Sequence, residues 1–287
     1  MKNIPVLLGA AMIALASCTQ KENTTVKTTT SSENTAQVKT IDSLMVNDSV
    51  RVSDKVTMQF RAKMLYFPEI KDKALQDSIY LTFADQLNGF SFAASAPQKT
   101  SPFGEYNRET LQSFLKQTQQ EYFDQTKKEL QGMQSPSFAQ TWYNSNKMEV
   151  KYHENGYLAI EYSADAYTGG AHGNYFFTEK TFDLENNKRM LLTDITAMPE
   201  EKISELLMKN LDKGTESKNY TRKDMLLVDK IPVTTNFYFD RNNLYFHYSP
   251  YEIAAYAAGD ILIPISWPEL KGTLNADFAK RMQIGHN

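Results

Sequence analysis

Residues 148–184 have the sequence MEVKYHENGYLAIEYSADAYTGGAHGNYFFTEKTFDL, and this stretch decides the fold class. Its apolar and aromatic residues recur with a period close to two, which is typical of β-strands. The dipeptide Asn155-Gly156 interrupts the pattern and accepts the positive φ angles of a two-residue hairpin turn. The stretch therefore predicts three successive antiparallel strands, at Met148–His153, Tyr157–Tyr167 and Tyr175–Leu184.

The segments before this stretch predict two strands followed by two helices. Apolar and polar residues alternate over Val56–Met64, and Ile41–Val52 is a weaker candidate for its partner strand. Apolar residues at helical spacing predict a helix over Leu75–Leu87 and a longer one over Arg108–Gln131, for which Asn107 is a suitable cap. Helices segregated from strands in this way indicate an α+β domain.

The segments after the stretch predict one more helix and a smaller set of strands. A helix is expected to start near Pro199, because proline is well tolerated in a first turn. Phe237–Tyr248 predicts a hairpin that turns at Asp240–Asn243. Ile261–Ile265 predicts a last strand, which Pro264 places at a sheet edge or strand end.

The predicted fold is α+β, with antiparallel sheets, helices packed on one side and two sub-domains. A boundary is expected between Gly132 and Thr141. It separates an N-terminal α+β sub-domain at 40–138 from a C-terminal domain at 139–275, which a tail at 276–287 follows.

The N-terminus is typical of a bacterial lipoprotein signal. Lys2 precedes an apolar run, Val6–Ala16, that is too short to span a bilayer, and Ser17-Cys18 follows. Residues 1–18 are therefore predicted to be a signal peptide processed at Cys18, which carries the lipid. Residues 19–39 are rich in threonine and lack aromatic residues, which predicts a flexible tether. The protein is expected in the cell envelope, at the outer membrane or periplasmic face.

Composition excludes several classes of partner and chemistry. The chain has 31 basic and 34 acidic residues, and its net charge is −3. Lysines alternate with acids instead of forming the basic stripe that nucleic acids require, so no nucleic acid partner is predicted. Cys18 is the only cysteine. Once it is lipidated, none remains for a disulfide, a zinc cluster or a thiol nucleophile.

The most informative candidate site is Tyr167-Thr168-Gly169-Gly170-Ala171-His172-Gly173. His172 could be a general base that Asp165 orients, with glycine amides as an oxyanion hole. No nucleophile in a recognisable setting accompanies them, and the four histidines include no pair at helical ligand spacing. No catalytic residue, metal or cofactor is therefore predicted. The alternative is a structural corner, in which glycines permit a chain reversal and His172 satisfies backbone groups through its two ring nitrogens.

A second segment, SPYEIAAYAAGD at residues 249–260, lies between two predicted strands. One interpretation is a short helical connection whose apolar residues pack inward. The other is an aromatic surface, in which Tyr251 and Tyr256 present amphipathic rings suited to sugars or peptides.

Three motifs in order resemble the C-terminal extracytoplasmic domain of RsiV-like proteins, a domain of unknown function that also accompanies peptidoglycan deacetylases of the PdaC type. They are the glycine–histidine stretch, LLTDI at 191–195 and YEIAAYAAG at 251–259. The resemblance covers roughly residues 140–270. RsiV-like proteins include anti-sigma factors whose external part senses lysozyme. For this chain the resemblance implies an accessory module on a lipid anchor, because the histidine ligand pair expected of the deacetylase domain is missing.

The sequence thus predicts a non-enzymatic envelope lipoprotein that binds a cell-wall glycan or a lysozyme-like protein. The expected binding residues are Tyr167, His172, Tyr251 and Tyr256. The alternative from another class is a hydrolase that uses Asp165 and His172, with or without a bound metal.

Overall fold

The computed structural model describes residues 38–88, 101–213 and 221–285. The predicted signal peptide, Cys18 and nearly all of the predicted tether at 19–39 lie outside these residues. Across the described ranges, no helix has both the length and the apolar character needed to cross a bilayer.

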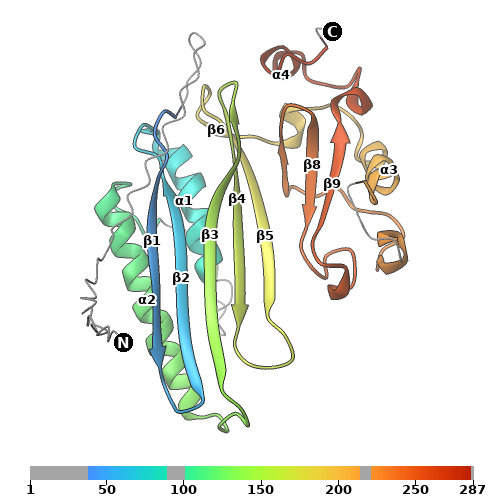
Figure 1. Ribbon diagram of the computed structural model, residues 1–287. Coiled ribbons are helices and arrows are strands. Elements are labelled where there is room, and N and C mark those ends of the chain that lie inside the picture. The colour runs from blue at the N-terminus through green and yellow to red at the C-terminus, as the bar shows by residue number, and fades with distance from the viewer. Residues whose placement is uncertain (1–37, 89–100, 214–220, 286–287) are drawn as a thin grey trace, which may run out of the picture.

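A six-stranded sheet forms the body of the molecule, and its strands lie in sequence order (Figure 1). All the strands predicted before Leu184 are present in it. Neighbouring strands are antiparallel except for one pair, β2 and β3, which are parallel. The strands are β1 (Asp42–Arg51), β2 (Val56–Tyr66), β3 (Gln140–Glu154), β4 (Tyr157–Tyr167), β5 (Asn174–Asp183) and β6 (Lys188–Arg189).

The parallel pair departs from the expectation of antiparallel sheets. Between β2 and β3 the chain forms α1 (Lys73–Asn88) and α2 (Arg108–Gln131). A hairpin turn cannot join parallel strands, whereas a long crossover through helices can. Both helices cover the same face of the sheet, as predicted (Figure 1). The prediction for α2 is confirmed down to its cap, since the Asn107 side chain accepts a 2.9 Å hydrogen bond from the Thr110 amide.

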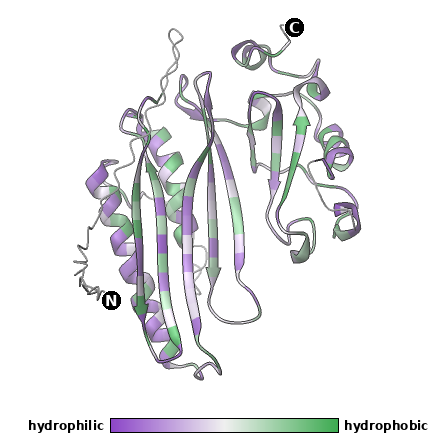
Figure 2. Cartoon of the chain, in the orientation of Figure 1, coloured by the Kyte–Doolittle hydropathy of each residue, from purple (hydrophilic) through white to green (hydrophobic). Residues whose placement is uncertain are grey.

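The first hydrophobic core lies between these helices and the sheet. Phe60 of β2, Phe83 of α1 and Leu115 of α2 are completely buried in it. Tyr162 of β4 is buried as well, and its hydroxyl donates a 3.0 Å hydrogen bond to the carbonyl of Ile79. Figure 2 shows that hydrophobic and hydrophilic residues alternate around both helices, so that each has an apolar stripe for the sheet and a polar side for solvent.

A second, three-stranded antiparallel sheet follows, in the order β7-β8-β9. Pro264 lies in its edge strand β9, as predicted, and Pro199 takes the cap position of α3 instead of its first turn. The elements of this part are η1 (Leu192–Asp194), α3 (Glu200–Asn210), η2 (Arg222–Met225), β7 (Phe237–Phe239), β8 (Asn243–Tyr248), η3 (Tyr256–Ala258), β9 (Ile261–Ser266), η4 (Trp267–Leu270) and α4 (Ala276–Arg281).

The large sheet supplies residues to two cores at once. Leu158 and Ile160 of β4 lie in the first core, whereas Tyr157 and Ala159 lie in a second core with the small sheet. Successive side chains of a strand point to opposite faces, so the small sheet packs on the face that the helices leave free. It does so chiefly against β5, through β7 and β8. The predicted sub-domain boundary between residues 138 and 139 stays a prediction. Strands from both sides of it, β2 and β3, pair with each other in the large sheet.

Candidate functional site

The glycine–histidine stretch forms the reversal between β4 and β5. Gly169 and Gly170 have φ angles of +92° and +104°, which residues with a β-carbon rarely adopt. A β-carbon on Gly169 would also lie 3.2 Å from the indole ring of Trp142. The glycines are therefore required by the backbone path and by the close approach of this ring.

His172 is exposed at the surface of this reversal. Its Nδ1 lies 2.7 Å from the carbonyl oxygen of Gly173, and its ring stacks on Tyr256, with centroids 4.2 Å apart and planes 23° from parallel. The Tyr256 hydroxyl donates a 2.8 Å hydrogen bond to the same carbonyl. His172 thus bonds to the backbone through one ring nitrogen, and not through both as the structural interpretation expected.

Tyr251 and Tyr175 extend this contact into a cluster of four rings. The rings of Tyr251 and Tyr256 lie 5.4 Å apart, and those of Tyr175 and Tyr256 lie 6.1 Å apart. Tyr251 is 58% exposed, although its φ angle of +70° is unusual for a tyrosine. We call His172, Tyr175, Tyr251 and Tyr256 the aromatic corner. It joins the β4–β5 reversal to the β8–β9 connection, which lie at the same end of the molecule (Figure 1).

The segment 249–260 matches neither interpretation completely. It contains one short 3-10 turn, Tyr256–Ala258, in place of a longer helix. Ile253 and Ala254 are buried, as the packing interpretation requires, whereas Tyr251 faces solvent, as the surface interpretation requires.

Tyr167 and Asp165 lie at the end of β4, where the chain enters the same reversal. The Tyr167 hydroxyl donates a 3.0 Å hydrogen bond to the Gly170 carbonyl, and its ring pairs with Tyr143 at 6.3 Å. The Asp165 carboxylate accepts a 3.1 Å hydrogen bond from the Tyr143 hydroxyl. Among the contacts of these described residues, none joins Asp165 to His172. The acid–base pair of the hydrolase alternative is therefore not assembled here.

A buried network of ionisable groups lies behind the aromatic corner, between the two sheets. His247 of β8 is 3% exposed and Glu179 of β5 is 1% exposed. His247 Nδ1 lies 2.8 Å from Glu179 Oε1, and His247 Nε2 lies 3.2 Å from Asp260 Oδ2. Phe177 covers the imidazole, with ring centroids 4.4 Å apart.

Two residues of the large sheet, Glu161 and Lys151, extend this network, and Asn236 links the two sheets. Glu161 of β4 is buried, and its Oε2 accepts a 3.0 Å hydrogen bond from Lys151 Nζ. Asn236 connects the sheets through the backbone, because its Oδ1 accepts from the Glu179 amide at 2.5 Å and its Nδ2 donates to the His247 carbonyl at 2.8 Å. Glu179 Oε2 is buried and has no hydrogen-bond partner among the described residues.

Burial and neighbouring charge shift the pKa values of this network strongly. Burial raises the pKa of Glu179 to about 7, although His247 opposes the shift. Burial alone would lower the pKa of His247, but hydrogen bonds with Asp260 and Glu179 outweigh it and raise the pKa to about 9. Both carboxylates therefore favour the charged form of the imidazole in this arrangement.

The network also approaches the aromatic corner. Partial burial and the nearby Asp260 carboxylate both raise the pKa of Tyr175. The Asp260 side chain is 39% exposed and forms the outer end of the network.

Sequence reasoning missed this network. The available signal was a charged residue inside a buried strand: Glu161 stands between Ile160 and Tyr162, and His247 stands between Phe246 and Tyr248. Spacing along the chain could not reveal the whole network, because His247 lies on a strand far in sequence from the β4–β5 pair that holds Glu161 and Glu179.

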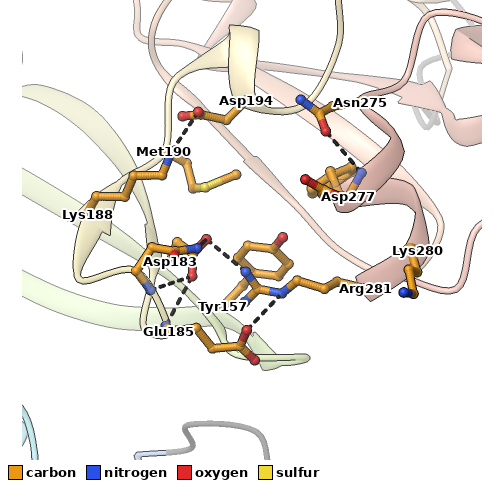
Figure 3. Close-up of a pocket in the computed structure, with 12 residues that line it drawn as sticks. Tyr157, Asp183, Glu185, Lys188, Met190, Asp194, Asn275, Asp277, Lys280 and Arg281 are labelled. Carbon is orange, nitrogen blue, oxygen red and sulfur yellow. Dashed lines mark hydrogen bonds and ion pairs between the residues drawn. The ribbon is translucent and has the colours of Figure 1, made fainter.

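A separate polar pocket of about 550 Å³ opens at the other end of the large sheet, beside the β3–β4 turn (Figure 3). Arg281 crosses it, with its guanidinium 4.0 Å from the ring centroid of Tyr157 and one nitrogen 2.8 Å from Asp183 Oδ2. Lys188 and Asp194 on its wall are paired at 2.7 Å. These charges already satisfy one another, so a ligand would have to compete with existing ion pairs.

The sequence matches two protein-family models, and the structure is similar to crystal structures of DUF3298 family proteins. The family model described as deacetylase PdaC matches residues 52–175, and that of a protein family of unknown function, DUF3298, matches residues 193–268. A crystal structure of a DUF3298 family member from Bacteroides fragilis NCTC 9343 is similar, with a TM-score of 0.67, 21% identity, and coverage of 87% of this chain and 99% of that one. A second, from Pseudomonas aeruginosa PAO1, has a TM-score of 0.53, 16% identity, and coverage of 83% and 95%.

At these identities the structural likeness shows the fold alone. No curated protein matches the sequence. The two family matches divide the site between them: His172 and Glu161 lie within the first matched segment, and Tyr251, Tyr256 and His247 lie within the second. The surface and the buried network are therefore formed only where the two segments meet.

Proposed function

Because the chain carries a PdaC domain followed by a DUF3298 domain, an extracytoplasmic module of unknown function, we propose that it is an envelope lipoprotein that binds cell-wall glycan through its aromatic corner. The binding is non-enzymatic. The observation that carries the proposal is the stacking of His172 on Tyr256 beside the exposed ring of Tyr251, because it joins both predicted segments into one aromatic surface.

The chemistry of the aromatic corner suits a sugar. A pyranose ring has an apolar face of C–H groups and a rim of hydroxyls, and it packs its face on an aromatic ring. Tyrosine offers both an apolar ring and a polar hydroxyl, so it suits an amphipathic ligand such as a sugar. The exposed Asp165 and the Tyr167 hydroxyl lie around the same reversal and supply polar partners for the rim. Tyr167 therefore stays in the proposed binding set with His172, Tyr251 and Tyr256.

We expect Tyr251→Ala and Tyr256→Ala each to weaken binding of a disaccharide-containing peptidoglycan fragment about tenfold. A stacked ring of this kind contributes about 1–1.5 kcal/mol, and about 1.4 kcal/mol is tenfold in Kd. Isothermal titration with the purified protein measures the change. Phe138→Ala is the matched control, because Phe138 is 63% exposed outside the aromatic corner. Its affinity is expected to equal that of the unaltered protein.

Three outcomes of this titration would contradict the proposal. Wild-type protein that does not bind the fragment removes glycan as the ligand. Binding of a lysozyme-like protein alone, sensitive to the same substitutions, would assign the surface to a protein partner. Turnover of the fragment that His172→Ala abolishes would favour the hydrolase alternative.

The lipid anchor is a separate part of the proposal, and the pattern around Cys18 supports it. In a bacterial host fed an alkyne-labelled fatty acid, the wild-type protein is expected to incorporate label and to sediment with membranes. Cys18→Ser should lose the label and leave the membrane fraction, because no other cysteine can accept the lipid. Label retained by Cys18→Ser would contradict the anchor.

A further inference from the structure

The buried network contains a cluster with the composition of a metal site. Ligand atoms of Glu161, Glu179 and His247 all lie within 4.8 Å of one another, and all three residues are buried. Glu161 and Glu179 are direct cross-strand neighbours on β4 and β5, and His247 of β8 reaches them because the small sheet packs on the large one. We infer that Glu161, Glu179 and His247 bind one divalent transition-metal ion, with Zn²⁺ as the species that fits best, and that the ion joins the two sheets.

The clearest sign of a missing partner is Glu179 itself. Its side chain is completely buried, yet its Oε2 has no hydrogen-bond partner within the described part of the chain. A buried carboxylate oxygen without a partner costs stability, and an ion at this position would satisfy it. Around a tetrahedral ion with bonds of about 2.0–2.2 Å, neighbouring ligand atoms lie roughly 3.3–3.6 Å apart, so Glu179 Oε1 and His247 Nδ1, which lie 2.8 Å apart, would move apart slightly to admit it.

The surroundings of His247 prepare it as a ligand. Asp260 Oδ2 lies 3.2 Å from His247 Nε2 and can keep the proton on that nitrogen, so that Nδ1 is the nitrogen that would give up its proton to bind the ion. A carboxylate behind a ligating histidine is the usual outer partner in metal sites, where it sets the tautomer and the ring orientation. Asp260 therefore acts as a positioning residue.

The charges of the network also match a divalent ion. The carboxylates of Glu161 and Glu179 face one ammonium group, that of Lys151, whereas Asp260 also interacts electrostatically with Arg222. Binding an ion requires the imidazole to lose its proton, and the two ligand carboxylates then leave a net negative charge beside Lys151 that a divalent cation offsets. One imidazole nitrogen with carboxylate oxygens is a donor set for Zn²⁺ or Mn²⁺, whereas Mg²⁺ and Ca²⁺ prefer oxygen alone.

The test is a titration of the full-length protein after treatment with a chelator. ZnCl2 is expected to bind in a ratio of one per chain and to raise the Tm by roughly 5–10 °C when its concentration exceeds the Kd about a hundredfold. MgCl2 should leave the Tm unchanged. Glu179→Gln keeps the shape of the side chain and should weaken zinc binding at least tenfold. His172→Ala is the control for adventitious binding to an exposed imidazole, and it should bind zinc as tightly as the wild type.

A crystallographic measurement keeps the inference testable even if Glu179→Gln fails to fold. Crystals of the wild-type protein with zinc should give an anomalous peak at the zinc edge about 2.0–2.1 Å from His247 Nδ1. A peak only at His172, no stoichiometric binding, or equal affinity in Glu179→Gln would overturn the inference. These results are independent of glycan binding, which is read at the aromatic corner.

Discussion

Phe239→Ala is expected to lower the free energy of unfolding by about 3–5 kcal/mol, the usual loss for a large aromatic residue removed from a packed core. Phe239 of β7 is completely buried. Its ring contacts four others, from the large sheet, from η4 and from α4. The centroid distances are 5.6 Å to Tyr152, 5.3 Å to Tyr157, 6.1 Å to Trp267 and 5.1 Å to Phe278.

The effect is large because one side chain holds three elements together. Tyr152 and Tyr157 belong to the large sheet, and Phe278 belongs to α4. Truncation to alanine leaves a cavity that rigid strands on two sides cannot collapse to fill. Urea unfolding monitored by circular dichroism measures the change. Phe138→Ala, at an exposed position, should stay within about 0.5 kcal/mol of the wild type. A loss below 1 kcal/mol for Phe239→Ala would show that the sheets are not joined through this ring.

His247→Ala is expected to cost a similar amount, about 3–5 kcal/mol, for a different reason. The substitution leaves Glu179 buried without the partner that stands 2.8 Å away. A carboxylate in this position must either stay charged in a dry environment or take up a proton, and both cost stability. The measurement is made with a chelator present, so that it reports on the ion pair and not on a bound metal.

A double-mutant cycle with Glu179→Gln separates the pair from simple loss of packing. If His247 and Glu179 stabilise each other, the double variant should be more stable than the sum of the single losses predicts, by at least 1.5 kcal/mol. His172→Ala serves as the control histidine and should cost less than about 1 kcal/mol, because its ring is exposed. If the two losses are additive, His247 and Glu179 do not stabilise each other.

The secondary structure was largely predictable because its causes are local. The alternation over β2, the Asn155-Gly156 turn and the Asn107 cap of α2 each depend on residues a few positions apart. The parallel pairing of β2 with β3 was not predictable in this way. Two helices separate these strands in the sequence, and no local pattern predicts that β3 pairs with the free edge of β2.

The candidate site shows the same limit. Each half of the aromatic corner was visible, as a glycine–histidine stretch and as a tyrosine-rich segment, but the sequence did not bring them into contact. The stacking of His172 on Tyr256 depends on two sheets that place their loops at one end. In the buried network, Glu161 and His247 stood out as ionisable residues between apolar ones, but nothing in the sequence showed that they meet.

By itself the sequence determined the α+β class, the places of the strands and helices, and the two segments that form the exposed rings. These follow from periodicity, turn chemistry and capping, which act within a few residues. Only the tertiary structure decided that β2 and β3 run parallel, that β4 is buried on both faces, and that His247 meets Glu161 and Glu179 in the interior, with Asp260 at its outer end. The physical reason is that burial of charge and contact between rings depend on which faces pack together, and that choice belongs to the whole chain.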